Sequence, residues 1–263
     1  MSSTGELRGN LVGRTTGSVF VRLAQHARYH DVPFRLAFAR DLICAKLADA
    51  REVLQRYQRN HGSATAGALD PIAEQLRLSV LAAHNAPTDA VLRGVEGAGA
   101  AAYFGTFNTL IRGPFAFEHR SRRPAHNAVN ALLNLGYTLV GNELSSRLEA
   151  AGFDPRVGFY HGVRYGRSSL ALDLLEAHRI RVVDRFTLSL LNRRMLTPED
   201  FKTSDEHGVR LTRLALRRYL AAYEAMMSRS STQDGSPRTR IETQITALRA
   251  QVMPHSEPSD PTQ

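Results

Sequence analysis

The chain has 263 residues, 43% of them hydrophobic, and carries a formal net charge of +9 with an isoelectric point near 10.3. This length is sufficient to bury the core of one or two domains, and no run of about 18 apolar residues is present that could span a membrane. Because the N-terminus also lacks the basic and then apolar pattern of a secretory signal, the sequence excludes an integral membrane protein and predicts a soluble intracellular one.

The positive charge is carried almost entirely by arginine, since the only lysines are Lys46 and Lys202. The planar guanidinium binds phosphate with two parallel hydrogen bonds and stacks on bases, so an arginine-rich surface favours a nucleic-acid partner. Codon bias in a GC-rich genome is an alternative explanation for the ratio of arginine to lysine, but it does not explain the net charge. The single cysteine, Cys44, lies within a helical pattern and is predicted to be a core residue.

The first 23 residues differ from those that follow. In "GELRGNLVGRTTGSVFVRL", Gly and Thr separate short apolar pairs, which predicts turns with one or two short strands. From about Pro33, apolar residues recur three and four apart, which is typical of an amphipathic helix. The segment "HGSATAGALD" breaks this pattern, and a second helix is predicted over 69–84.

Further helices follow in the middle of the chain. Thr88 or Asp89 is expected to cap a third helix, which continues through Glu96 to Ile111. A basic loop, "RGPFAFEHRSRRPAHNA", then leads to a long helix that is predicted to end just before Gly152.

The last third of the chain is also predicted to be mostly helical. After the glycine-rich connection "RVGFYHGVRYGRSS", the helical period returns in "LALDLLEAHRIRVVDRFTLSLLNRR", and one more helix is predicted over 210–228. Residues 229–263 are predicted to be mostly disordered, with a possible short helix over 239–252. The sequence thus predicts a mainly α protein with one helical domain over 24–228.

Three places put a metal-binding side chain in unusual surroundings. Glu96 lies among small residues in "GVEGAGAAAYF", and His161 lies among aromatic residues and glycines in "GFYHGVRYG". Asp173 and Glu176 are three residues apart in a leucine-rich helix and therefore share a face. Each has an ordinary alternative: Glu96 as a first-turn acid, His161 as a hydrogen-bonded turn residue, and the two acids as ion-pair partners of Arg179.

Together these side chains meet one chemical requirement. Two carboxylates and a neutral imidazole form a hard, oxygen-rich site for Mg²⁺ or Mn²⁺, while the lack of thiolates argues against structural zinc. Such an ion can polarise a phosphodiester and stabilise its leaving oxygen. In an arginine-rich protein, the natural substrate for that chemistry is nucleic acid.

Three ordered segments resemble consecutive signature blocks of one protein family. They are "GVEGAGAAAYFGTFNTLI", "RSRRPAHNAVNALLNLGYTLVGNELSSRLEAAGFDPRVGFYHG" and "SSLALDLLEAHRIRVVDRFTLSLLNR". The resemblance is to the CRISPR-associated adaptation endonucleases, the Cas-one integrases that insert new spacers into a CRISPR array. It extends from about residue 20 to residue 225, in order and with similar spacing.

The resemblance implies an N-terminal β-domain and a larger helical catalytic domain with a Glu–His–acid metal site. By position in the signature blocks, the catalytic metal ligands fall on Glu96, His161 and Glu176. Asp173 matches an accompanying catalytic acid, which orients a ligand or binds the ion transiently. The implied metal is Mg²⁺ or Mn²⁺.

The resemblance also implies a reaction and its partners. A 3′-hydroxyl of captured DNA attacks a phosphodiester of the CRISPR repeat, and water replaces it in the related hydrolysis. The expected partners are double-stranded and branched DNA, a second copy in a homodimer, and the Cas-two protein, all in a prokaryotic cytoplasm. The basic segments are expected to contact the DNA backbone through Arg120, Arg122, Arg123, Arg164 and Arg167.

The N-terminus departs from the family pattern. Only about twenty residues precede the helical part, so residues 1–23 resemble the last strand and linker of the family's β-domain. A fragment, a misplaced start codon and a natural short form would each explain this, and the segment is expected to be loosely attached. A non-catalytic DNA-binding remnant and a helical scaffold without a nucleic-acid role therefore remain alternatives to the integrase.

Overall fold

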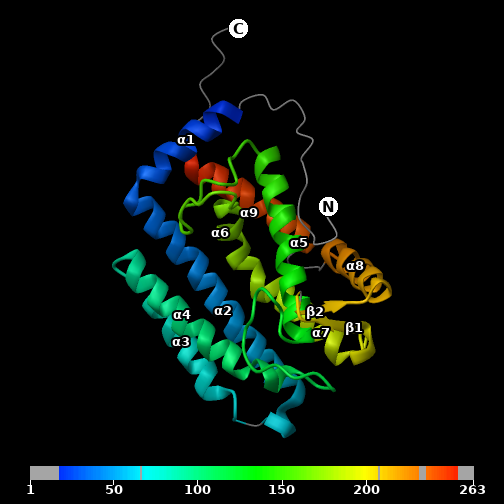
Figure 1. Cartoon of the computed structure of the whole chain (residues 1–263). Coiled ribbons are helices and arrows are strands. Elements are labelled where there is room, and N and C mark those ends of the chain that lie inside the picture. Colours follow the sequence, from blue (N-terminus) through cyan, green and yellow to red (C-terminus); the bar gives the residue numbers. More distant parts are fainter. Residues whose placement is uncertain (1–17, 66, 207, 231–234, 254–263) are drawn as a thin grey trace.

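The computed structural model describes residues 18–65, 67–206, 208–230 and 235–253, and its architecture is mainly helical, as predicted (Figure 1). The α-helices are α1 (Ser18–His30), α2 (Val32–Thr65), α3 (Asp70–His84), α4 (Asp89–Thr106), α5 (Ala128–Ala150), α6 (Ser169–His178), α7 (Arg185–Asn192), α8 (Arg213–Ser228) and α9 (Pro237–Val252). Short 3₁₀ turns η1 (Phe107–Leu110) and η3 (Pro198–Asp200), a π-helix η2 (Arg179–Asp184), and strands β1 (Phe201–Ser204) and β2 (Gly208–Leu211) complete the described elements. None of these helices is both long and apolar enough to cross a membrane.

Helix α2 lies at the centre of the fold. It packs against α3 and α4 on one side and against α6 and η2 on the other. Its apolar face contributes Ile43, Leu47 and Leu54 to the core, which removes apolar surface from water and joins the two sides. Helix α4 begins where the sequence predicted, because the Thr88 side chain accepts a hydrogen bond from the Val91 amide at 3.3 Å.

Helix α5 supplies the second wall of the core. Its buried residues include Leu132, Val140, Leu144 and Leu148, and it ends just before Gly152, as predicted. The next helical segment was predicted as one run, but the structure divides it into α6, η2 and α7. The π-helix inserts extra residues per turn between α6 and α7, so the side chains after Glu176 emerge at different angles from those of a continuous α-helix.

The predicted N-terminal strand is wrong for the residues that the structure describes. The segment "SVFVRL" forms the first turns of α1, whereas residues 1–17 of the predicted β-remnant lie outside the described residues. Val21 and Gln25, four residues apart, face inward. The buried Gln25 amide donates to the carbonyls of Asp154 and Val157 and accepts from the Asp154 amide. These tertiary contacts outweigh the β-propensity of the two valines.

The domain boundary predicted at residue 228 is also wrong. Helix α9 confirms the possible helix over 239–252 but begins earlier, at Pro237, and the Ser236 side chain caps it. It packs against α1, α5 and α8, and it buries Ile241, Ile245, Leu248 and Val252. Residues 235–253 therefore belong to the packed body and are not a disordered tail.

A short antiparallel hairpin was not predicted. Strands β1 and β2 pair with Phe201 opposite Leu211, and the Val209 amide donates to the Ala125 carbonyl at 2.9 Å. The strands are only four residues long and mostly polar, so they lack the alternation that reveals a strand in sequence. The hairpin holds the end of the basic loop that precedes α5.

The packing of α9 can be tested by shortening one buried side chain. Ile245→Ala should lower the free energy of unfolding by about 2–5 kcal/mol, because it leaves a cavity against neighbouring helices. Thr246→Ala, on the exposed face of the same helix, should change it by less than about 0.5 kcal/mol. Urea unfolding at neutral pH measures both values, and equal small effects would mean that α9 does not pack as described.

Candidate metal centre

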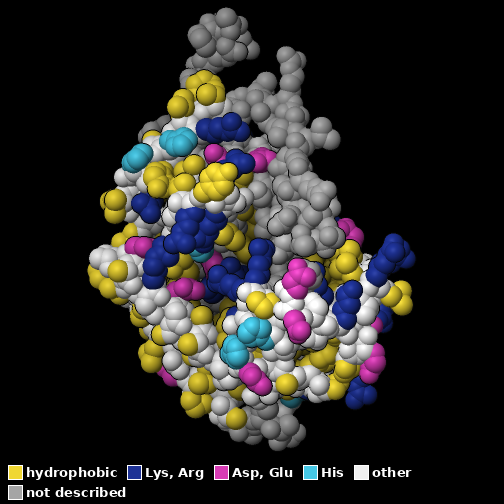
Figure 2. Space-filling model, viewed as in Figure 1, with side chains coloured by type: hydrophobic (Ala, Val, Ile, Leu, Met, Phe, Trp, Pro, Cys, Tyr) yellow, Lys and Arg dark blue, Asp and Glu magenta, His cyan; other side chains and the backbone are white. Residues whose placement is uncertain are grey.

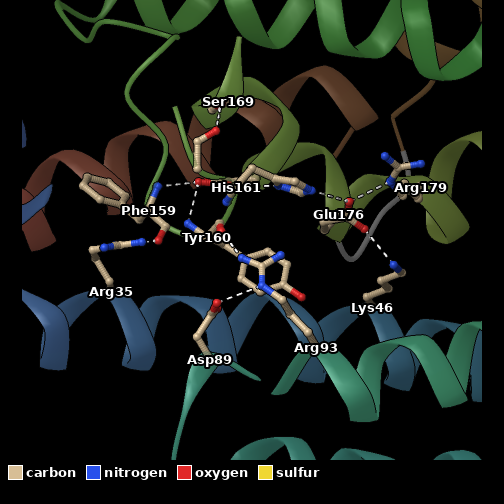
Figure 3. Close-up of polar contacts among 12 residues, drawn as sticks. Arg35, Lys46, Asp89, Arg93, Phe159, Tyr160, His161, Ser169, Glu176 and Arg179 are labelled. Atoms are coloured by element: carbon tan, nitrogen blue, oxygen red, sulfur yellow. Dashed lines mark hydrogen bonds and ion pairs between the residues drawn. The ribbon is translucent and has the colours of Figure 1, made fainter. Parts of the chain in front are cut away.

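A cavity of about 520 Å³ lies between α2, α4 and α6, under the segment that connects α5 to α6. Glu96 from α4, His161 from the connecting segment and Glu176 from α6 all line it. Figure 3 shows the His161 ring pointing toward Glu176, which Lys46 and Arg179 approach from other directions. The structure thus brings the three predicted ligands to one place, while their binding of a metal ion stays a prediction.

Glu176 is the most deeply placed acid of the cavity, with 4% of its surface exposed. Its Oε1 accepts a hydrogen bond of 3.0 Å from Nε of Arg179, which confirms the ion pair considered from the sequence. Its Oε2 lies 2.8 Å from Nζ of Lys46. Burial alone would raise the pKa of Glu176, but Lys46 and Arg179 outweigh it and hold the pKa at about 2.

Lys46 joins the two acids of the cavity. Its Nζ forms ion pairs with both Glu96 and Glu176, and the residue is only 7% exposed. Burial disfavours the charged ammonium, but the two carboxylates raise the pKa of Lys46 above its usual value. The sequence analysis did not include Lys46 in the site. Its available signal was a rare lysine on the apolar face of α2, one residue before the buried Leu47.

Asp173 builds the turn that carries His161. This fully buried carboxylate accepts hydrogen bonds from the amides of Phe159 (2.6 Å), Tyr160 (3.0 Å) and His161 (2.7 Å). Its Oδ1 also lies 2.8 Å from Nδ1 of His161. A carboxylate at Nδ1 favours the tautomer with its proton on that nitrogen, so the lone pair of Nε2 faces the cavity. Nε2 lies 3.9 Å from Oε1 of Glu176.

Two glycines allow these groups to come together. A Cβ at Gly99 would lie 2.3 Å from Cδ2 of Leu47, so a larger residue here would require the Leu47 side chain to move. A Cβ at Gly158 would lie 2.7 Å from the His161 carbonyl oxygen. By contrast, Gly94 and Gly97 have open space around them, so the small residues near Glu96 are only partly explained by close packing.

The donor groups of the cavity fit a hard divalent cation. Oε2 of Glu176 has Lys46 as a charge partner but receives no hydrogen bond with suitable geometry. Together with the Glu96 carboxylate and Nε2 of His161, it forms an oxygen-rich set of donors. Within the described residues, no group of three or more His, Cys, Asp and Glu side chains is already arranged around one metal position. The ammonium of Lys46 instead stands between the two acids.

The floor of the cavity holds a second buried acid, Asp184. Its Oδ1 accepts a 2.5 Å hydrogen bond from the Tyr137 hydroxyl. Burial raises the pKa of Asp184 to about 6, although Tyr137, Arg120 and Arg179 oppose the shift. The guanidinium groups of Arg120 and Arg179 lie over the Tyr137 ring, at 5.2 and 4.7 Å from its centroid.

The predicted DNA-contacting arginines differ in their surroundings. Arg122 and Arg123 are exposed, whereas Arg120 turns inward and donates to Oδ1 of Asn130 (2.7 Å) and of Asn134 (2.6 Å). Arg120 thus fixes the fold of the basic loop, a role that the sequence analysis missed. Its contact with DNA stays a prediction.

Arg164 and Arg167 lie on the segment that follows His161. Burial lowers the pKa of Arg167, and the nearby positive charges of Arg164, Arg122 and Arg93 lower it further. Arg93 was not predicted; its guanidinium lies 4.3 Å from the centroid of the Tyr160 ring. Figure 2 shows Lys and Arg side chains gathered across the middle of this face of the molecule. Arg93 and Arg122 also line the cavity, so positively charged side chains border its acids.

The comparisons of this chain with known proteins all find members of one family. The family model described as "CRISPR associated protein Cas1" matches residues 1–225. The chain is 40% identical over 235 residues to CRISPR-associated endonuclease Cas1 2 of Rhodospirillum rubrum, covering 85% of this chain and 67% of that protein. It is 39% identical over 228 residues to CRISPR-associated endonuclease Cas1 3 of Thermus thermophilus, covering 87% and 65%. The chain thus spans about two thirds of the length of these relatives.

Solved structures share the fold. A CAS1 protein from Thermotoga maritima has a TM-score of 0.79 and 24% identity, over 98% of this chain and 78% of that one. A casposase bound to integration product has a TM-score of 0.80 and 20% identity, with 99% and 72% covered. A chain of a Cas6-RT-Cas1–Cas2 complex has a TM-score of 0.82 and 24% identity, with 95% and 28% covered.

The buried Asp184 predicts a pH effect on stability. Its pKa is about 6 in the folded protein and near 3.8 in the unfolded chain, so the folded state binds this proton more tightly. The stabilising contribution is present below about pH 4 and is lost as the pH rises through 6. Asp184→Asn mimics the protonated acid and does not lose this contribution. Its free energy of unfolding should therefore rise relative to that of the parent by about 2–3 kcal/mol as the pH increases from 4 to above 6.

Urea unfolding of the parent and of Asp184→Asn, measured from pH 4 to pH 7.5, tests this effect. Asp41→Asn, on the exposed face of α2, is the control and should follow the parent. If Asp184→Asn kept a constant stability difference from the parent over this range, the raised pKa would be wrong.

Proposed function

The chain belongs to the Cas1 family, and we propose that its cavity is the active site of a metal-dependent DNA endonuclease and integrase of CRISPR adaptation. The observation that carries the proposal is the convergence of Glu96, His161 and Glu176 on one cavity beneath a basic surface. Its relatives are named endonucleases, and one protein of the same fold is a casposase bound to integration product. The names of those proteins support the reaction class proposed for this chain.

The proposed cofactor is Mg²⁺ or Mn²⁺, held by Glu96, Glu176 and Nε2 of His161. When bound, such an ion supplies positive charge that polarises a phosphodiester and stabilises its leaving oxygen. The protein's part is to keep its acidic ligands ionised and its histidine ligand oriented. Arg179 and Lys46 keep Glu176 charged at neutral pH, and Asp173 keeps the Nε2 lone pair of His161 directed into the cavity.

The proposed substrates are double-stranded and branched DNA. Arg122, Arg123, Arg164 and Arg167 lie on the two segments around the cavity mouth, where guanidinium groups can neutralise backbone phosphates on either side of the reacting one. The proposed reaction is transesterification: a DNA 3′-hydroxyl attacks the phosphodiester, and the bond to the leaving 3′-oxygen breaks. Water takes the place of the hydroxyl in hydrolysis.

The proposed partners are a second copy of the chain and a Cas2 protein. Support comes from the fold shared with a chain of a Cas6-RT-Cas1–Cas2 complex. The chain spans about two thirds of its relatives, and its own assembly is part of the proposal. A DNA-binding form without catalytic activity is the competing outcome of the activity test.

Strand transfer and nicking of a branched DNA substrate, in Mg²⁺ or Mn²⁺, test the proposed function. Glu176→Gln removes a charged ligand and should abolish both activities. Asp173→Asn should reduce them by about 10–100-fold, because this residue acts by orienting His161. Glu74→Gln, on the exposed face of α3, is a control that should retain parent activity.

Three results would count against this assignment. Cleavage that persists in excess chelator would contradict metal dependence, and full activity of Glu176→Gln would contradict the ligand set. DNA binding without any metal-stimulated turnover of the parent chain would favour the non-catalytic DNA-binding form.

A further inference from the structure

A second and larger cavity lies on the opposite side of α2 and η2 from the candidate metal centre. It is a groove of about 1020 Å³ between the C-terminal half of α2, η2, α7 and α8. Within η2 and the residue after it, Arg179 and Asp184 line the metal cavity, whereas Arg181 and Arg185 line this groove. The two cavities are therefore separated by a layer of protein and have different linings.

Five of the arginines that line the groove have no acidic partner among the residues that the structure describes. We call this cavity the arginine groove, because five arginines converge on it: Arg56, Arg112, Arg185, Arg193 and Arg229. They come from α2, from the segment after η1, and from α7, α8 and the residues that directly follow these two helices. None of these five side chains lies within 4 Å of a carboxylate from the described parts of the chain. The nearby acids Asp49 and Glu52 are instead engaged by Arg181, at 3.4 and 3.9 Å.

The positive charges in the groove repel one another. Burial lowers the pKa of Arg185, and the charges of Arg56 and Arg181 lower it further, while Glu52 and Asp49 offset only part of the effect. Holding several like charges at one concave surface has an electrostatic cost that an anionic partner relieves. This arrangement therefore points to a ligand with several negative charges in a row.

The chemistry of the lining favours a phosphodiester chain with accessible bases. Arginine binds phosphate oxygens with a planar pair of donors. Glu52, the acid among the described lining residues, pairs with Arg181, which leaves the donors of the five arginines available. Tyr57 and His61 add an edge-to-face ring pair, with centroids 4.7 Å apart, to the same lining. Positive grooves with aromatic side chains are the usual means of binding single-stranded nucleic acid, whose unpaired bases can stack.

We propose that the arginine groove is a binding site for single-stranded nucleic acid, separate from the active-site cavity. The strand's phosphates would lie along Arg56, Arg112, Arg185 and Arg193, with bases against Tyr57 and His61. The site goes beyond the proposed function, since it needs neither the metal ligands nor turnover. It gives the chain a place to hold an unpaired strand while a different segment of DNA occupies the catalytic side.

The test is binding of fluorescently labelled oligo(dT) by the full chain, in chelator, over a series of salt concentrations. The exposed triple variant Arg56→Ala/Arg112→Ala/Arg193→Ala should bind at least about 10-fold more weakly at physiological salt. Its plot of log affinity against log salt should be flatter by about 2 units, since each phosphate contact on a single strand contributes about 0.7. The use of chelator separates this result from any failure of the metal-dependent activity.

Two further variants make the result specific. Arg22→Ala/Arg59→Ala/Arg156→Ala removes the same charge from exposed positions outside the groove and should change affinity by less than about 3-fold. Replacing the three groove arginines by lysine keeps the charge and should restore most of the salt dependence.

Three outcomes would overturn the proposal. The first is an equal loss of oligo(dT) affinity in the groove and control variants. The second is a loss of affinity for duplex DNA that matches the loss for oligo(dT), which would remove the assignment to a single strand. The third is unchanged oligo(dT) binding with lost binding of polyglutamate, which would assign the groove to an acidic protein.

Discussion

The structure depends on neutralising one buried carboxylate, Glu176. A charged acid with 4% exposure is strongly unfavourable unless cations and hydrogen bonds replace its water, and here Lys46 and Arg179 do so. Because Lys46 comes from α2 and also pairs with Glu96 on α4, this requirement brings α2, α4 and α6 to a single point. Gly99 lies at the same contact, where α4 packs against Leu47, the residue next to Lys46.

The acids of the site have different tasks. Asp173 accepts hydrogen bonds from three backbone amides and contacts Nδ1 of the His161 ring, so its charge stabilises the 159–161 turn. Glu96 and Glu176 share the Lys46 ammonium, and Oε2 of Glu176 receives no hydrogen bond with suitable geometry. The same division applies to the arginines: Arg120 is bound by asparagine side chains, whereas Arg122 beside it is exposed. Hydrogen-bonded charges build the cavity, and Arg122 lies exposed at the surface.

Much of the helical order could be predicted, because periodic apolar residues and the caps at Thr88 and Gly152 are local signals. The wrong predictions concern segments whose structure is determined by contacts between residues far apart in the sequence. The "SVFVRL" segment is helical because Gln25 reaches the carbonyls of Asp154 and Val157, and no local pattern contains that information. Signature blocks located Glu96, His161 and Glu176, but Lys46 is fifty residues from Glu96 in sequence and only the fold brings it to the acids. The arginine groove likewise could not be predicted from the sequence, since its five arginines are spread over four segments of the chain.

The central claim is that Glu96, His161 and Glu176 form one cation site, in which the Lys46 ammonium lies where a divalent ion would bind. Crystals soaked in Mn²⁺, measured near the manganese absorption edge, test it most directly. The account predicts an anomalous peak between the two carboxylates and Nε2 of His161, with Nζ of Lys46 moved away from its position between the acids. A peak bound by other residues, or Lys46 still bridging Glu96 and Glu176 at saturating Mn²⁺, would contradict it.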